Sequence, residues 1–400
     1  MWLWLLTAIP LLSPLLEAKL LFSIIAIILV FYSSIEGKRS FLNAGERGVF
    51  NVLIAALLLS LSSFAGVPAY IYSSPFATLP FAKFARNGIE RLTLTSLAVL
   101  AYLAYFNYYS PFNLTPPTIL FLAVVAGLTV SLIYSVDSPD RNLASVIGVA
   151  SVFMTLHIYS PSVTLADLIV AFSSAFILSF LATRSGVADE SGLMSATLVG
   201  MLIILFTDIR YYAVLLTFYI AGSAATKYKY QYKLTIGEAE PAGGARGYAN
   251  VFGNSLPALF FAMNYGFYGV SAMKAAFVAS VASALADTMA SEIGKTSRKA
   301  YLITNLKPVK PGVSGGVSAL GEVAALAGAL LTALSALVLG VLDSSLVVLV
   351  TLSAFFGVHV DSLLGATLEK KGYLTNSLVN LLGNFSAGLV CYLLLKWSLL

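Results

Sequence analysis

Long apolar runs separated by short polar breaks extend through the whole sequence and constrain its fold more than any other feature. About 20 apolar residues suffice for a helix to cross the hydrocarbon core of a bilayer. Only 10% of the residues are charged, against about 25% in soluble domains, and the apolar–polar alternation of a membrane β-barrel is missing. The sequence therefore predicts an all-α, polytopic transmembrane helical bundle of about 13 to 14 spans and excludes a water-soluble enzyme.

Basic residues gather in one window of the second half. Between Lys227 and Lys310 there are ten Lys or Arg residues and four Asp or Glu residues. Such loops lie on the cytoplasmic side of membrane proteins, so we expect an integral membrane protein whose active site faces the cytoplasm. Lys227, Lys229 and Lys233 are interpreted as anchors of one loop at the anionic leaflet. A nucleic-acid partner is not expected, because apolar helices interrupt the window and no surface of stacking aromatic residues accompanies it.

The two parts of the chain differ in where their polar residues lie. Residues 1–170 are predicted to form N-terminal transmembrane helices, to which the sequence assigns no role. Their first apolar run, residues 2–16, carries Pro10 and Pro14 and is expected to be either a span or a re-entrant segment. In residues 171–400 many charges lie at helix ends or beside glycines. This part is therefore predicted to be a transmembrane catalytic domain with its active site at the cytoplasmic face.

Asp287 and Asp361 are the strongest candidates for chemistry. Each lies near the predicted cytoplasmic end of an apolar run and is followed by a hydroxyl residue. A carboxylate at membrane depth is costly, and a pair of them suits Mg²⁺, which completes its shell with water and substrate phosphate. The alternative is that each aspartate only ends its helix at the headgroup level. Glu292 is interpreted as a base or metal ligand, or as a solvated carboxylate paired with Lys295.

A glycine-rich loop, residues 310–318, precedes another apolar run and suggests phosphate binding. Successive backbone N–H groups and a helix N-terminus favour anions, and lysines lie beside this loop. It lacks the Gly-Lys-Ser/Thr ending of a Walker A motif, and a plain flexible loop is the alternative. The candidate residues are Lys307, Lys310, Ser314, Gly315, Gly316 and Ser318.

Two polar stripes enter otherwise apolar runs. Arg246, Asn250 and Asn254 are spaced four residues apart, and the same spacing recurs at residues 376, 380 and 384, which are all asparagines. Buried amides can link helices, whereas the planar guanidinium of arginine suits bidentate contact with phosphate. Arg246 and Asn254 are therefore candidates for phosphate or nucleotide binding. Glu369 lies on roughly the same predicted helix face as Asp361.

At these positions residues 172–400 resemble the phytyl-phosphate kinase family, an integral membrane family that includes the transmembrane protein 19 group. The resemblance is carried by six motifs. They are Ser191-Gly192, the Gly243-Gly244-Ala245-Arg246 run, the stretch from Ala279 to Gly294 with its Ala286-Asp287-Thr288-Met289-Ala290-Ser291-Glu292-Ile293-Gly294 string, Ile303-Thr304 to Lys307, the Gly312 to Ser318 loop, and Asp361-Ser362-Leu363-Leu364-Gly365-Ala366-Thr367-Leu368.

The resemblance implies transfer of a phosphoryl group from CTP or another nucleoside triphosphate to an isoprenyl monophosphate, such as phytyl or geranylgeranyl phosphate, to give the diphosphate. On this basis Asp287 and Asp361, with Glu292 as a further candidate, would hold Mg²⁺, while Arg246, Lys307 and the loop at Ser314 to Ser318 would hold phosphates. The expected partners are the nucleotide, the isoprenyl phosphate lipid and membrane lipids. The alternatives are a polyprenol kinase, a CTP-dependent lipid cytidylyltransferase, and a lipid or solute transporter.

Overall fold

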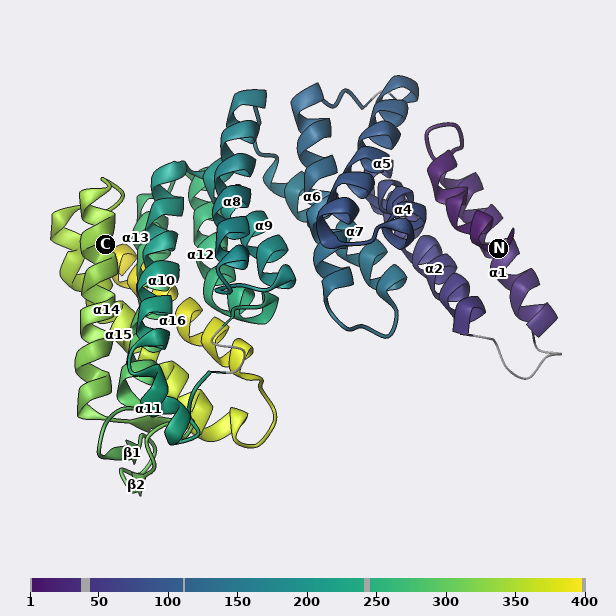
Figure 1. Ribbon diagram of the computed structural model, residues 1–400. Coiled ribbons are helices and arrows are strands. Elements are labelled where there is room, and N and C mark those ends of the chain that lie inside the picture. Colours follow the sequence, from purple (N-terminus) through teal and green to yellow (C-terminus); the bar gives the residue numbers. More distant parts are fainter. Residues whose placement is uncertain (1, 37–43, 111, 241–244, 398–400) are drawn as a thin grey trace. The chain divides into compact units, whose positions relative to one another are not determined.

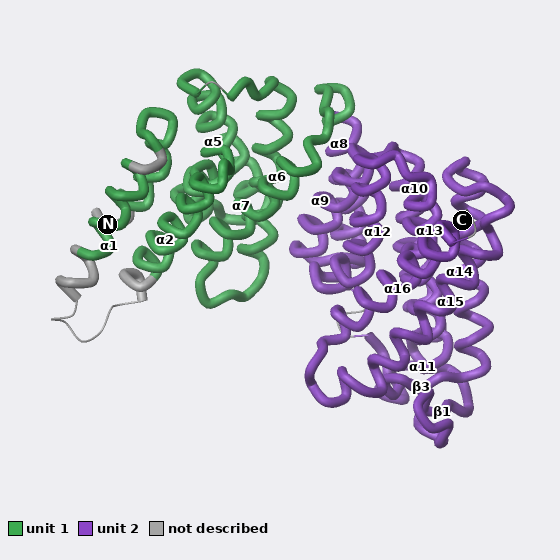
Figure 2. Tube along the Cα trace, turned by 180° about the vertical axis from the view of Figure 1, so that it is seen from behind, with its two compact units in different colours: residues 1–168 green, residues 169–400 purple. Residues whose placement is uncertain are grey.

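The computed structural model describes residues 2–36, 44–110, 112–240 and 245–397 (Figure 1). The chain divides into two compact units, Met1–Leu168 and Ile169–Leu400, which are drawn in green and purple in Figure 2. Both units are built almost entirely of helices.

The first unit is a bundle of apolar helices. Its elements are η1 (Trp2–Leu12), α1 (Ala18–Glu36), α2 (Ala44–Leu61), η2 (Ser62–Ala65), α3 (Ala69–Ser73), η3 (Ser74–Thr78), α4 (Leu79–Phe84), α5 (Gly88–Tyr109), α6 (Pro116–Ser135) and α7 (Arg141–Tyr159). Asn87, Thr115 and Asp140 cap α5, α6 and α7, each side chain accepting a hydrogen bond from the backbone N–H three residues later. Buried apolar side chains of α1, α2, η3 and α7 form one hydrophobic core.

The second unit is organised around α13. Its helices are α8 (Leu165–Arg184), α9 (Glu190–Phe206), α10 (Ile209–Lys227), α11 (Tyr230–Thr235), α12 (Tyr248–Tyr268), α13 (Ser271–Gly294), α14 (Ala319–Val338), η5 (Ser344–Leu346), α15 (Val347–Leu364), η6 (Gly365–Glu369) and α16 (Asn376–Trp397). Helix α13 packs against α10, α12, α14, α15 and α16. Residues 275–286 of α13 are all buried, and most are alanine or serine, which lets neighbouring helices approach closely.

Nine helical segments of the described chain are long and apolar enough to cross a membrane. The predicted polytopic helical membrane fold is thereby confirmed, and the chain is an integral membrane protein. The prediction of about 13 to 14 spans counted every apolar run as a span. Residues Trp2–Leu12 instead form a 3-10 helix, α9 has only 17 residues, and α10 and α12 are not among the nine segments.

A small sheet follows α13, which the all-α prediction did not include. Its strands are β1 (Ala300–Leu302), β2 (Pro308–Val309) and β3 (Gly316–Val317), antiparallel in the order β2-β1-β3. Strands this short carry no periodicity that a sequence could reveal. Both views show the sheet beside α11 (Figures 1 and 2), at the end of the second unit where α13 and α15 finish. We call this end of the second unit the site end.

Candidate functional site

Small residues bring α13, α15 and α16 into close contact near the site end. A Cβ atom on Gly357 of α15 would lie 2.5 Å from Ser283 Oγ of α13 and 2.7 Å from the Gly383 carbonyl oxygen of α16. Nothing larger than glycine fits there without a shift of the backbone. The three helices therefore meet almost backbone to backbone, which fixes the positions of the side chains on the next turn.

Asp287 and Asp361 lie one turn further toward the site end. Asp287 follows Ser283 by four residues and Asp361 follows Gly357 by four, and residues four apart share a helix face. Both carboxylates are partly buried and near enough to interact electrostatically. Neither forms an ion pair with any described residue. Lys295 interacts with Asp287 electrostatically but pairs directly with Glu240 and Glu292. Two neighbouring carboxylates that lack a directly paired cation repel each other, so this arrangement favours a bound cation.

The donor set fits a Mg²⁺ ion that is shared with a phosphate. In the described ranges no group of three or more His, Cys, Asp or Glu side chains could hold a metal ion. Proteins commonly bind Mg²⁺ through one or two carboxylates and leave the remaining positions to water and substrate phosphate. Asp287 and Asp361 match this pattern. Ser283 Oγ, one turn deeper, is buried and has no hydrogen-bond partner among the described residues.

Two further polar side chains surround the aspartates. The side-chain amide of Asn380 is assigned with its nitrogen facing Asp361. In this orientation the amide N–H groups donate hydrogen bonds to Asp361 Oδ2 at 3.2 Å and to the Asn376 carbonyl at 3.0 Å. Glu369 in η6 interacts electrostatically with both aspartates. The sequence showed Asn380 and Glu369 only through their helical spacing, and neither was predicted to belong to the site.

Arg246 reaches the same region from the start of α12. A Cβ on Gly222 of α10 would lie 2.8 Å from Arg246 Nη2 and 3.4 Å from the Thr288 methyl carbon. The guanidinium and the residue after Asp287 therefore meet at one glycine.

The Arg246 side chain is buried and has no carboxylate partner among the described residues. Among the described residues, the guanidinium donates one long hydrogen bond, from Nη1 to Asn250 Oδ1 at 3.5 Å. The rings of Phe218 and Tyr219 lie 4.8 and 5.6 Å from the guanidinium carbon. Burial lowers the pKa of Arg246, and electrostatic interactions with Tyr219, Glu292 and Glu240 oppose this shift without outweighing it, because a charge without a directly bonded anion loses more hydration than it regains. An incoming phosphate would supply that partner.

Backbone contacts explain the Ser191-Gly192 motif. The Arg246 N–H donates to a carbonyl of the α8–α9 loop at 2.8 Å, and Ser191 Oγ accepts a bond from the N–H two residues after Arg246 at 2.9 Å. A Cβ on Gly192 would collide with the Arg246 carbonyl oxygen. The start of α9 therefore fixes the backbone of the arginine. Gly243 and Gly244 lie outside the described residues.

Asn254 lies deeper and links two helices. Its Nδ2 donates to the Asn250 carbonyl at 2.9 Å, and its Oδ1 accepts a bond from Asn384 at 3.3 Å. Asn384 is tied to α13 in turn, because its carbonyl accepts a bond from Ser280 Oγ at 2.8 Å. The amides thus hold α12, α13 and α16 together behind the site, and the predicted phosphate contact of Asn254 stays a prediction.

The first part of the glycine-rich loop packs on η6. Ser314 Oγ donates to Glu369 at 2.5 Å. Gly315 has a φ of 74° and a Cβ there would overlap Ala366, so both the left-handed conformation and the close approach require glycine. The loop is thereby held beside the carboxylate that faces the two aspartates.

The remaining predicted phosphate ligands have other contacts. The Gly316 N–H donates within its own turn at 2.8 Å. Ser318 caps α14 by accepting a bond from a backbone N–H at 3.1 Å. Lys307 and Lys310 are exposed on either side of β2, and neither forms an ion pair with a described residue. Phosphate binding by these four residues stays a prediction.

Glu292 is buried between two lysines. Its carboxylate oxygens lie 2.5 Å from Lys233 Nζ and 2.8 Å from Lys295 Nζ, and Lys295 also contacts Glu240 at 3.0 Å. Burial lowers the pKa of Lys295, but its bonds to the two glutamates outweigh this and raise the pKa above its usual value. Lys233 is 0% exposed, so its interpretation as a leaflet anchor was wrong. With both oxygens engaged, Glu292 stays only a predicted base or metal ligand.

Residues 173–388 match the family described as integral membrane protein DUF92. An uncharacterized membrane protein of Synechocystis sp. is 34% identical over 224 residues, which cover 53% of this chain and 86% of the relative. An uncharacterized membrane protein of Methanocaldococcus jannaschii is 30% identical over 229 residues, or 57% and 94% of the two chains. Protein VTE6, chloroplastic, of Arabidopsis thaliana is 30% identical over 277 residues, or 66% and 81%. No solved structure matches. The family match covers more than half of this chain and includes the motifs described above. The chain therefore belongs to this integral membrane family.

Proposed function

We propose that this protein is a Mg²⁺-dependent isoprenyl-phosphate kinase. It transfers the terminal phosphoryl group of CTP, or of another nucleoside triphosphate, to a prenyl monophosphate such as phytyl or geranylgeranyl phosphate. The observation that carries the proposal is a separation of charge among the described residues. Asp287 and Asp361 form no ion pair with a cation, and they lie near the buried guanidinium of Arg246, which forms no ion pair with an anion. A metal-bound phosphate satisfies both groups at once.

The reaction suits side chains of this kind. A phosphate oxygen of the lipid forms a bond to the γ-phosphorus, the bond from that phosphorus to the β-phosphate breaks, and the nucleoside diphosphate leaves. Such transfer depends on positioning and charge stabilisation more than on a covalent nucleophile, and the lipid phosphate is already an anion, so a strong base is unnecessary. Arg246 binds and orients a phosphate, and Asp287 and Asp361 would hold Mg²⁺. The metal supplies neutralisation of the charge on the transferred group.

The location of the site also supports a lipid substrate. The charged groups lie at the site end of membrane helices, where a headgroup could meet a soluble nucleotide while the prenyl chain stays in the bilayer. Basic loops at this end favour a cytoplasmic orientation, the side on which nucleotides are available.

The purified protein in nanodiscs, incubated with γ-labelled CTP and geranylgeranyl phosphate, should transfer label to a lipid diphosphate and release CDP. EDTA should abolish the transfer and Mg²⁺ should restore it. The enzyme is a cytidylyltransferase instead if α-label enters the lipid and pyrophosphate is released. Label transfer that is indifferent to EDTA would remove Mg²⁺ from the proposal.

Arg246→Lys should lower kcat/KM by about 10- to 100-fold, because charge-assisted hydrogen bonds contribute about 1.5 to 3 kcal/mol and the lysine cannot make a bidentate contact. The matched control is Arg210→Lys. Arg210 lies in the first turn of α10, far from the Gly222 that contacts Arg246, and it pairs with Asp208 at 2.8 Å at a solvent-exposed position. Equal activity losses in the two variants would contradict a phosphate contact at Arg246.

A further inference from the structure

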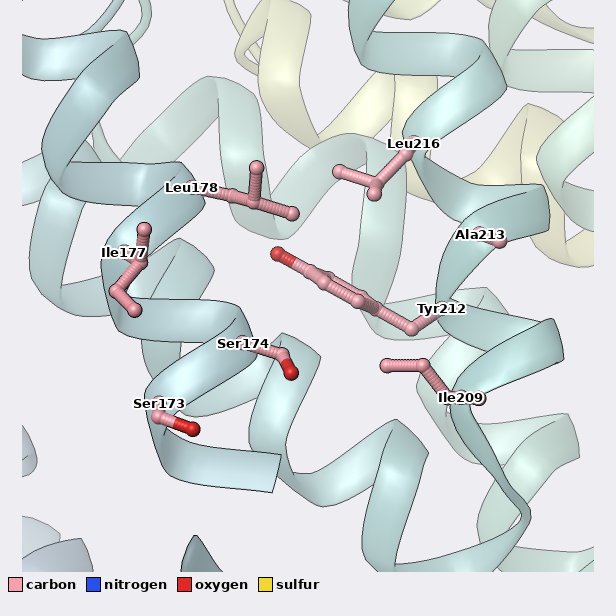
Figure 3. A pocket seen from close by; sticks show the side chains of 8 residues that line it. All are labelled: Ser173, Ser174, Ile177, Leu178, Ile209, Tyr212, Ala213 and Leu216. Carbon is pink, nitrogen blue, oxygen red and sulfur yellow. The ribbon is translucent and has the colours of Figure 1, made fainter. Parts of the chain in front are cut away.

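A groove lies between α8 and α10, and none of the residues that line it is charged (Figure 3). Its volume is about 360 Å³, and it is lined by four residues of α8 and four of α10: Ser173, Ser174, Ile177, Leu178, Ile209, Tyr212, Ala213 and Leu216. This volume is within the roughly 300 to 1,000 Å³ typical of ligand pockets. Its lining is apolar apart from three hydroxyl residues, Ser173, Ser174 and Tyr212. Such a cavity suits a hydrocarbon chain and not a charged ligand.

The groove is closed on one side and open on another. Tyr212 is buried, and a Cβ on Gly200 of α9 would lie 2.6 Å from its ring, so α9 and the tyrosine form a wall. Ile177 and Leu178 at the opposite edge are 53% and 40% exposed. In a membrane this edge faces lipid, and a chain could therefore enter sideways from the bilayer.

The groove and the Arg246 guanidinium both lie along α10 but on different faces of the helix, because Leu216, Ile209 and Ala213 are turned by about 120 to 180° from Gly222. The guanidinium lies against Gly222, and the groove begins six residues away at Leu216 and ends 13 residues away at Ile209. At a rise of 1.5 Å per residue, the groove extends from about 9 to about 20 Å from the level of the guanidinium.

These distances match a prenyl chain of particular length. Extended chains advance by roughly 1.1 Å per bond. A geranylgeranyl chain has about 16 bonds from the phosphate oxygen to the chain end, so it reaches about 18 Å and would fill the groove. A geranyl chain reaches about 9 Å and would stop at the edge of the groove.

We propose that the groove between α8 and α10 binds the distal isoprene units of the lipid substrate and makes the enzyme select long prenyl chains. This inference rests on the proposed kinase function, with the substrate phosphate at Arg246. Ala213, the smallest side chain in the lining, then sets the space available to the chain end.

The experiment compares geranylgeranyl phosphate with geranyl phosphate as substrates of the full-length protein in nanodiscs. Ala213→Phe and Leu216→Phe should lower kcat/KM for geranylgeranyl phosphate at least tenfold and change that for geranyl phosphate less than twofold. Activity on the short substrate shows that each variant is folded. Leu334→Phe on the exposed face of α14 is the matched control and should affect neither substrate. Equal losses with both substrates, or none, would overturn the proposal.

A second measurement does not depend on catalysis. Geranylgeranyl phosphate with a diazirine on its last isoprene unit should label peptides from residues 173–178 and 209–216, and Ala213→Phe should reduce that labelling. Labelling spread evenly over other lipid-facing helices, such as α14, would reject the groove even if the kinase assay succeeds. If no lipid diphosphate forms but the groove is labelled, the kinase function fails and the groove remains a prenyl site.

Discussion

Asp361→Asn and Asp287→Asn should each lower kcat/KM for phosphoryl transfer about a thousandfold. Asparagine keeps the size of aspartate but loses its charge, and a carboxylate that holds a catalytic metal contributes roughly 4 kcal/mol to transition-state stabilisation. The fold should tolerate the change, because an amide oxygen at position 361 can still accept the hydrogen bond from Asn380.

Stability provides the sharper test of this pair. Two facing carboxylates repel each other without a cation, so each asparagine variant should unfold at the same or a higher temperature than the wild type in EDTA. Mg²⁺ should stabilise the wild type by mass action and stabilise the variants much less.

Asp343→Asn is the matched control, because Asp343 is exposed near the start of the helix that carries Asp361 and caps no backbone group. It should leave activity and the Mg²⁺ effect unchanged. Full activity in both Asp287→Asn and Asp361→Asn would refute the metal site, and lower stability in EDTA would show that the carboxylates do not repel each other.

The fold follows from the sequence where a single property decides it. Apolar runs predict membrane helices because a bilayer offers no partner for unpaired backbone groups. Apolar composition is a less decisive criterion for a helix such as α10, because its tyrosines and charged ends lower its mean hydropathy. It is also less decisive for strands of two or three residues, because such strands depend on contacts that local composition does not encode.

The aspartates could be found from the sequence because topology alone brings the ends of two membrane helices to one face. Asn380 and Glu369 needed the packed structure, since their relation to Asp361 depends on how α16 and η6 lie against α15. The sequence also does not show the environment of Lys233, and here the prediction from the sequence was wrong. A lysine in a basic loop is usually solvated, and only its contact with Glu292, 59 residues further along the chain, shows that it is buried.

Lys233→Met should destabilise the protein by about 1.5 to 3 kcal/mol, because the buried Glu292 carboxylate loses one of its two charge-assisted hydrogen bonds and keeps only the one from Lys295. The lysine also donates to the carbonyl of Thr226 at 2.6 Å at the end of α10, so that helix loses a capping contact as well. Denaturant-induced unfolding in mixed micelles measures the change. Lys227→Met, at an exposed position in the last turn of α10, is the matched control and should shift stability by less than about 0.5 kcal/mol.

Combining Lys233→Met with Glu292→Gln tests whether the cost comes from an unpaired charge. The glutamine carries no charge that needs a partner, so the double variant should be more stable than Lys233→Met alone, and the two changes should be strongly non-additive. Additive losses would mean that the lysine acts only through α10. Because α13 carries both Glu292 and Asp287, the stability of this buried pair also determines how firmly the end of α13 holds one of the two proposed metal ligands.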